Sequence, residues 1–144
     1  MTTTRPIPVP TPETQPFWKA ARDGYLLLQR CASCKRFVFY PRLVCPHCLG
    51  EELAWTRCSG HATVYSFTRV ERAPAAFKQE APYVVALVDL AEGVRMLTRI
   101  KTETPEAVHI GMRVRAEFEP VSDTLSLPVF VPVIGSNAKS RAGI

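Results

Sequence analysis

Apolar and polar side chains alternate along the C-terminal half of the chain with a period of two, which is typical of half-buried β-strands. The alternation predicts strands at residues 62–72, 83–90, 94–101, 112–119 and 124–133. Segment 83–90 is apolar at nearly every position, so this strand is expected to be buried on both faces. Five strands within about 75 residues predict an OB-fold barrel, with an SH3-like barrel or a β-sandwich as alternatives.

The same alternation predicts which side chains face outward. In the last strand, one face is expected to carry Leu125, Leu127, Val129, Val131 and Val133. The outer surface of the barrel is expected to be basic and partly aromatic, made of Tyr65, Phe67, Arg69, Arg95, Arg99, Lys101, Arg113 and Arg115. Such a surface suits single-stranded nucleic acid or the adenine and phosphates of a nucleotide-like cofactor. It equally suits simple solvation of the barrel.

The N-terminal residues are predicted to form an extended arm and a short helix. Prolines at positions 6, 8, 10, 12 and 16 prevent regular pairing, so residues 1–16 are expected to be extended. Residues 13–24 predict a helix that ends at Gly24. Its aromatic residues, Phe17 and Trp18, are expected to cap the core rather than to bind a ligand.

Four cysteines form two closely spaced pairs in the pattern C-x2-C-x10-C-x2-C, made by Cys31, Cys34, Cys45 and Cys48. This spacing predicts a tetrahedral Zn²⁺ site on a small antiparallel ribbon, with strand-forming residues on both sides of Pro41. Disulfides, free thiols and an iron–sulfur cluster are the alternatives. Because four thiolates fill the coordination shell, the predicted zinc is structural and not catalytic.

Two residues near this pattern have a simpler interpretation. His47 lies inside the second pair and is expected to be solvated, because four cysteines already suffice as ligands. Cys58 could act as a nucleophile, but a small buried side chain is the preferred interpretation. The chain is therefore divided into an arm and helix (1–26), a zinc ribbon (27–58), an OB-fold (59–134) and a disordered tail (135–144).

Composition limits the classes of function. The formal net charge is +5, and four zinc-bound thiolates with their ion would lower it to +3, which is weak for a nucleic-acid binder. The longest apolar run, residues 83–91, is interrupted by Asp89 and is far shorter than a membrane helix. The start lacks the layout of a signal peptide, so a cytoplasmic location without a membrane partner is expected.

No set of residues predicts catalysis. The sequence has no Gly-rich phosphate loop and no G-x-S-x-G motif, and its three histidines are scattered. A binding module is therefore expected. The loop at residues 72–82 joins the first two barrel strands and carries Phe77, and OB-folds often bind their ligands through this loop.

Several segments stand in the order that is typical of one family, namely PFWKAARDGYLLLQRC, YPRLVCPHC, LAWTRCSGHATVYSFTRV, PYVVALVDLAEGVRML and IGMRVRAEFE. Over about residues 14–133, the chain resembles the DUF35 family of zinc-ribbon and OB-fold proteins, which is associated with acyl-CoA chemistry. The resemblance implies a rubredoxin-like ribbon packed on the barrel. It implies that the four paired cysteines bind zinc, and it offers no catalytic residue.

The resemblance also implies a partner. Family members are commonly small subunits of thiolases or thiolase-like acyltransferases and aldolases, whose large subunit holds the catalytic residues. The chain is expected to be inactive alone and to support assembly and the coenzyme A site. Phosphate contacts are expected from Arg69, Arg95 and Arg99. Partner contacts are expected from Phe77, Tyr65 and Phe67. A single-stranded nucleic-acid-binding protein and a free-standing acyl-CoA-binding protein are the alternatives.

Overall fold

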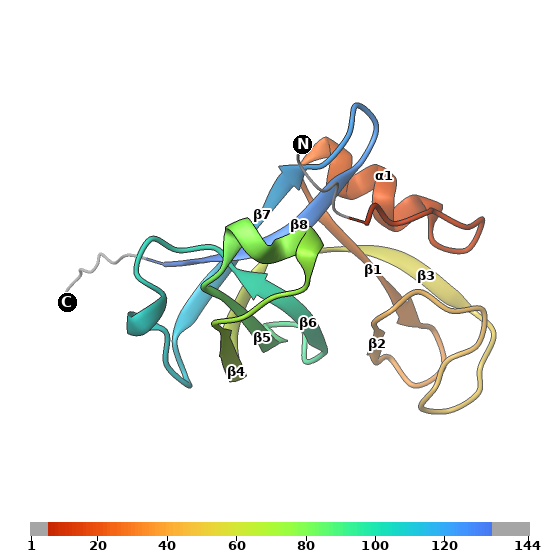
Figure 1. The fold of residues 1–144 in the computed structure, drawn as a ribbon. Helices are drawn as coiled ribbons and strands as arrows, with labels where there is room; N and C mark the ends of the chain where they lie inside the picture. The colour runs from red at the N-terminus through yellow and green to blue at the C-terminus, as the bar shows by residue number, and fades with distance from the viewer. Residues whose placement is uncertain (1–5, 134–144) are drawn as a thin grey trace.

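The computed structural model describes residues 6–133; the predicted tail at 135–144 and residues 1–5 lie outside this range. A helix and a small sheet are followed by a closed barrel (Figure 1). The elements are α1 (Gln15–Asp23), β1 (Leu26–Cys31), β2 (Phe37–Val38), β3 (Leu53–Cys58), β4 (His61–Val70), η1 (Ala75–Glu80), β5 (Tyr83–Leu90), β6 (Arg95–Ile100), η2 (Pro105–Ala107), β7 (Arg113–Pro120) and β8 (Ser126–Pro132). Neither α1 nor the short 3-10 helices of residues 6–133 have the length and apolar character needed to cross a membrane.

Helix α1 ends at Gly24, as the sequence predicts. Gly24 has φ +94°, a left-handed conformation that glycine adopts without the steric cost of a side chain. The helix buries Phe17 and Trp18, whose rings meet edge to face with centroids 4.9 Å apart. Nε1 of Trp18 also donates a hydrogen bond to the Tyr40 hydroxyl at 3.1 Å. The helix therefore packs on the barrel strands β7 and β8 and is also tied to the ribbon.

Strands β2, β1 and β3 form the ribbon sheet, with β1 in the middle. The prediction of strand on both sides of Pro41 holds only before it, since β2 ends at Val38. The reason lies in Gln29, whose buried side-chain amide accepts from the Arg42 N–H at 2.7 Å and donates to the Arg42 carbonyl at 2.8 Å. Both backbone groups of Arg42 are thereby satisfied without a strand partner.

The five predicted strands of the C-terminal half form a closed barrel in the order β4-β5-β6-β8-β7, which is an OB-fold arrangement. Strand β5 alternates fully buried and half-buried residues, so only one of its faces is as buried as predicted. The barrel core contains Val64, Val84, Val88, Met96, Ile100, Val114 and Phe130. The predicted fold class, a helix and zinc ribbon followed by a five-stranded barrel, is confirmed.

A β-bulge in β4 overturns the predicted alternation in its second half. The register with β5 shifts between Val64 and Ser66, so Tyr65 is an extra residue on the bulged strand. One extra residue reverses the two faces of everything that follows. Phe67, predicted to point outward, therefore packs against the barrel core, and its ladder partner is the buried Ala86.

Strand β8 also departs from its predicted pattern. Val129 and Phe130 are adjacent in sequence and both are buried, which a strand with one solvated face does not allow. Helix α1 packs against β8, so this strand has apolar contacts on two sides. Val133, placed on the buried face by the sequence pattern, is exposed. The prediction thus missed Phe130, one of the largest fully buried side chains.

Truncation of Phe130 tests the position of this core. Phe130→Ala should lower the free energy of unfolding by roughly 3–5 kcal/mol, because it leaves a large cavity in the buried core. Leu97→Ala is the matched control, since Leu97 is 64% exposed, and it should change stability by no more than about 0.5 kcal/mol. Urea unfolding monitored by circular dichroism measures both values. Equal stability of the two variants would show that the Phe130 side chain does not contribute to the stability of the core.

Candidate metal centre

The four paired cysteines lie on two similar turns of the ribbon. The first turn follows β1, and the Lys35 N–H donates to the Cys31 carbonyl at 2.9 Å. In the second turn the Leu49 N–H donates to the Cys45 carbonyl, also at 2.9 Å. Lys35 and Leu49 both have φ 67°, a left-handed conformation that is uncommon for residues other than glycine and that these tight turns require. The two cysteine pairs are therefore held by the same backbone geometry, related across the ribbon.

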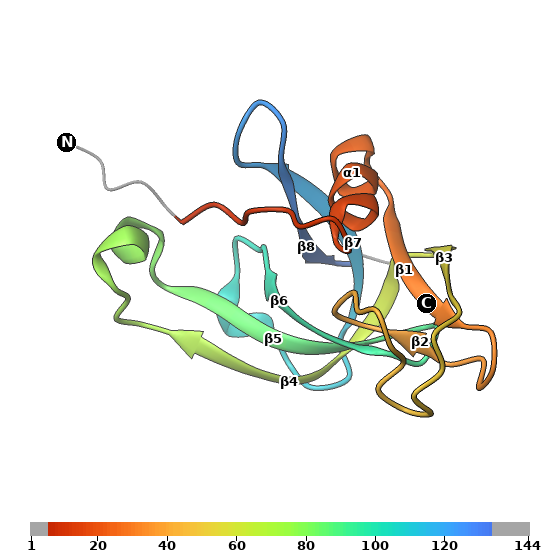
Figure 2. The ribbon, with the colours of Figure 1, turned by 90° about the vertical axis from the view of Figure 1, so that its right-hand side faces the viewer.

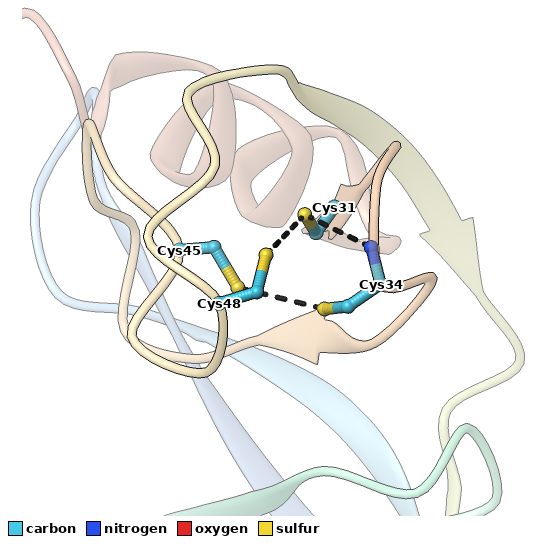
Figure 3. A group of neighbouring side chains, drawn as sticks. All are labelled: Cys31, Cys34, Cys45 and Cys48. Atoms are coloured by element: carbon cyan, nitrogen blue, oxygen red, sulfur yellow. Dashed lines mark hydrogen bonds between the residues drawn. The ribbon is translucent and has the colours of Figure 1, made fainter.

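The four sulfur atoms converge on one point (Figure 3). Sγ of Cys31 lies 3.5 Å from Sγ of Cys48, and Sγ of Cys34 lies 3.7 Å from Sγ of Cys45. All four ligand atoms lie within 4.8 Å of one another. Zinc–sulfur bonds of about 2.3 Å in a tetrahedron require sulfur atoms about 3.8 Å apart, so this donor set fits Zn²⁺. None of these cysteines forms a disulfide.

The surroundings of the sulfur atoms shift the pKa values of the thiols in different directions. At Cys48 the backbone N–H of Gly50 lowers the pKa, but the neighbouring cysteine side chains and burial raise it to about 11. The Cys34 N–H, 3.5 Å from Sγ of Cys31, is the main cause that lowers the pKa of this thiol to about 6, although burial opposes it. The His47 N–H donates to Sγ of Cys45 at 3.3 Å. Gly50 leaves room for the cluster, because a Cβ there would lie 3.3 Å from Sγ of Cys48 and 3.4 Å from Sγ of Cys31. The centre thus combines backbone donors with close packing.

His47 takes no part in the group of candidate metal ligands, which consists of the four cysteines. Its side chain is exposed, and its Nδ1 lies 3.3 Å from Nη1 of Arg36. This agrees with the expectation of a solvated histidine.

Cys58 is a buried side chain of the core between ribbon and barrel, as the sequence indicates. Burial, and next the nearby Glu92 carboxylate, raise the pKa of its thiol to about 12. A thiol with this pKa is protonated at neutral pH and is a poor nucleophile. Cys58 therefore packs rather than reacts.

Glu92 was missed from the sequence and ties the barrel to the ribbon. One of its carboxylate oxygens accepts the backbone N–H of Ser59 at 2.8 Å, across 33 positions of sequence. The neighbouring Ala91 N–H donates to the His61 carbonyl at 2.9 Å. The turn between β5 and β6 is thereby fastened to the ribbon–barrel junction. No local sequence signal marks this contact, because its two ends meet only in the folded barrel.

The three arginines predicted to meet phosphates do not form one site. Partners in a β-ladder share a face: Arg69 pairs with Val84, whereas Arg99 pairs with Val85 on the opposite face of β5. The bulge at Tyr65 causes this separation. Arg69 instead forms an ion pair with Glu71 at 2.5 Å.

Arg95 and Arg99 share the outer face, but both already have internal partners. Arg95 makes a two-pronged ion pair with Asp89, at 2.6 and 3.2 Å, and its guanidinium carbon lies 3.4 Å from the centre of the Tyr65 ring. Arg99 forms an ion pair with Glu80 of η1 and lies 4.8 Å over the Tyr83 ring. Each charge is therefore compensated, and one face of each ring is covered.

The residues predicted to contact a partner lie in three different environments. Tyr65 is 48% exposed beneath Arg95, and Phe67 is partly buried in the barrel. Phe77 lies in η1 with its ring centroid 6.2 Å from that of Tyr83, and it is half-buried. Figure 2 shows η1 at the far end of the long β4–β5 hairpin from the ribbon. The role of these residues in binding a partner stays a prediction.

Comparisons with known proteins agree with this architecture. Residues 18–54 match the family model of the ChsH2 rubredoxin-like zinc ribbon domain, and residues 55–119 match that of the ChsH2 C-terminal OB-fold domain. A DUF35 domain-containing scaffold protein of Methanocaldococcus jannaschii is 36% identical over 108 residues, which are 74% of this chain and 77% of that protein. The chain belongs to the DUF35 family.

Two further relatives show how far the likeness extends. A solved structure of the Ltp2-ChsH2(DUF35) aldolase contains a chain that is 35% identical, with a TM-score of 0.77, covering 88% of this chain and 98% of that one. A probable enoyl-CoA hydratase alpha subunit of Thermomonospora curvata is 37% identical over 131 residues, or 90% of this chain. This DUF35 chain spans only 40% of the length of that hydratase subunit.

Alkylation tests the protonated state of Cys58. At pH 8, iodoacetamide should modify Cys58 of the native protein roughly a thousandfold more slowly than an ordinary thiol, because burial removes its thiolate. A Ser59→Cys variant supplies the matched control, since position 59 is the exposed neighbour. Peptide mass spectrometry measures both sites against time. Equal rates at positions 58 and 59 would contradict the burial argument.

Proposed function

We propose that this chain is a non-catalytic accessory subunit of a thiolase-like enzyme that makes or breaks carbon–carbon bonds in acyl-CoA substrates. The observation that carries the proposal is the likeness to the DUF35 chain of the Ltp2-ChsH2(DUF35) aldolase, which extends over 98% of that chain. The relatives described as scaffold proteins point the same way. The chain would support assembly with a large subunit that holds the catalytic residues, in the reducing cytoplasm where its cysteines stay free.

The local chemistry supports an accessory role. A metal ion held by four thiolates has no open position for water or substrate. The buried Cys58 thiol is protonated. The arginines Arg69, Arg95 and Arg99 are each held by a carboxylate. Catalytic groups would therefore come from the partner.

We expect one structural Zn²⁺ to be held by Cys31, Cys34, Cys45 and Cys48. Bound there, it would supply cross-linking of the two turns, which the ribbon cannot replace with a core of its own. The second hydrophobic cluster of the ribbon contains only Cys31, Val38 and Cys45 as buried residues. Removal of the ion should therefore loosen the ribbon before the barrel.

The outer face of the barrel favours a protein partner over single-stranded nucleic acid. Bases bind OB-folds by stacking on free aromatic faces, with cations that contact phosphates. Here Arg95 covers one face of Tyr65 and Arg99 covers one face of Tyr83, and both arginines are ion-paired. Nucleic acid would have to displace these contacts. A compensated surface with exposed Leu97 between the two arginines suits a protein interface instead.

Co-expression with a thiolase-like large subunit from the same organism tests the partnership. The two chains should elute together in size-exclusion chromatography, and the isolated chain should not turn over acyl-CoA thioesters. Separate elution, combined with tight and salt-sensitive binding of an oligonucleotide, would reject the proposal.

Substitution in η1 tests the partner surface. Phe77→Asp should weaken co-purification by roughly tenfold or more, because it places a charge in a desolvated contact. Gln79→Asp is the matched control, since it adds the same charge at an exposed position of the same helix. Affinity is measured by surface plasmon resonance. An equal effect of both substitutions would indicate a change of net charge and not a contact of Phe77.

Metal removal tests the zinc centre. Metal analysis should find about one Zn²⁺ per chain, and Cys48→Ser should lower both metal content and melting temperature, because metal binding stabilises the folded ribbon. Cys58→Ala should keep the metal, since Cys58 is not among the candidate ligands. A metal-free chain with an unchanged melting temperature would contradict a structural role.

A further inference from the structure

A cleft lies between the ribbon and the turn that joins β5 to β6. It has a volume of about 440 Å³, within the range of small-molecule sites. The lining residues include Lys35, Arg36 and His47 of the ribbon and Glu92, Val94 and Arg95 of the barrel. Glu92 accepts a hydrogen bond from Ser59, the first residue after β3, so the turn between β5 and β6 is held next to the end of the ribbon.

The two ribbon cations of the cleft, Lys35 and Arg36, differ from several cations of the barrel, among them Arg95 on the opposite wall. On the barrel, Arg69, Arg95, Arg99, Lys101 and Arg115 each pair with a carboxylate. Among residues 6–133, Lys35 and Arg36 have no such partner. Lys35 and Arg36 therefore lie on one wall of a concave site without a carboxylate partner, and a site lined by such cations attracts an anion. With Zn²⁺ bound, the four thiolates would carry a net charge of −2 close to these two cations and would offset part of that attraction.

The backbone and neighbouring side chains orient these cations. Lys35 adopts φ 67°, and its carbonyl accepts a hydrogen bond from Nε of Arg30 at 3.0 Å. A glycine would adopt this conformation at lower steric cost, so the backbone geometry does not favour a lysine at this position. Nη1 of Arg36 lies against Nδ1 of His47 at 3.3 Å, which leaves its other N–H groups for a ligand.

The opposite wall contributes Arg95 as a hydrogen-bond donor, and its one carboxylate, that of Glu92, does not face the open part of the cleft. Nε and Nη2 of Arg95 are used by Asp89, which leaves Nη1 unused by that ion pair. Glu92 lines the cleft, but one carboxylate oxygen accepts the Ser59 N–H and the other is buried without a hydrogen-bond partner. The carboxylate is thus turned towards the junction and not towards the open part of the cleft.

We propose that this cleft binds the phosphate groups of a small molecule through Lys35 and Arg36, with Arg95 as an additional donor. Arginine offers parallel donors that match phosphate oxygens, and lysine adds a compact charge. The source of the phosphate rests on the proposed function: the adenosine phosphate end of an acyl-CoA is the phosphate ester that such an assembly handles. The site replaces the predicted set of Arg69, Arg95 and Arg99, of which only Arg95 lines the cleft.

Calorimetric titration of the zinc-loaded chain, alone and in complex with its partner, tests the site. The probes are coenzyme A, dephospho-coenzyme A, pantetheine and inorganic phosphate. Coenzyme A should bind, pantetheine should not, and added salt should weaken binding. Binding of inorganic phosphate at the same affinity as coenzyme A would support a phosphate site with a different source. Equal binding of pantetheine and coenzyme A, or no binding of any probe in either state, would overturn the proposal.

Matched variants locate the binding. Arg36→Gln and Lys35→Gly should each lower the affinity for coenzyme A by roughly ten- to a hundredfold, as expected for a lost charge-assisted hydrogen bond. Lys35→Gly also keeps the left-handed turn, so loss of binding cannot be assigned to an unfolded ribbon. Arg42→Gln removes an exposed ribbon cation outside the cleft and should have no effect. An equal loss of affinity in Arg42→Gln would show that coenzyme A is attracted by the overall charge of the ribbon and not bound in the cleft.

Co-purification separates this inference from the proposed function. If Arg36→Gln leaves the complex intact and coenzyme A binding unchanged, the cleft is rejected and the accessory role remains. If coenzyme A binds through Arg36 but no partner associates, the cleft stands and the accessory role fails.

Discussion

Four sulfur atoms within 4.8 Å of one another are the constraint on which the N-terminal third of the molecule depends. Without a shared metal ion, closely spaced thiolates would repel each other, and the ribbon has few buried apolar residues to oppose this. With the ion, two turns of the same geometry are fixed face to face. The side chains in and beside these turns, including Lys35, Arg36 and His47, would be positioned by the bound ion.

The ribbon is joined to the barrel by contacts on two sides. Helix α1 packs on β7 and β8 and bonds to the ribbon through Trp18 and Tyr40. The turn after β5 reaches the junction through Glu92, and the buried Cys58 fills the space beneath it. A cleft between two such fastened parts has walls of defined separation. This preorganisation lowers the entropic cost of binding a ligand there.

Ion pairing on the barrel changes what its basic residues can bind. An arginine that holds a carboxylate and covers an aromatic ring is a rigid part of the surface, and its charge is largely compensated. Arg95 and Arg99 are of this kind, with Leu97 exposed between them. Such residues suit contact with a protein. Lys35 and Arg36 of the ribbon, by contrast, have no carboxylate partner among residues 6–133.

The sequence by itself determined the features that depend on local spacing. These include the two cysteine pairs, the end of α1 at Gly24 and the five barrel strands, because turn chemistry and the period of two act over a few residues. Only the tertiary structure decided the rest. The bulge at Tyr65 reversed the face of Phe67 and separated Arg69 from Arg95. Contacts across 33 positions fastened Glu92 to Ser59. Such effects arise from pairing register and long-range packing, which a local pattern of apolar and polar residues does not encode.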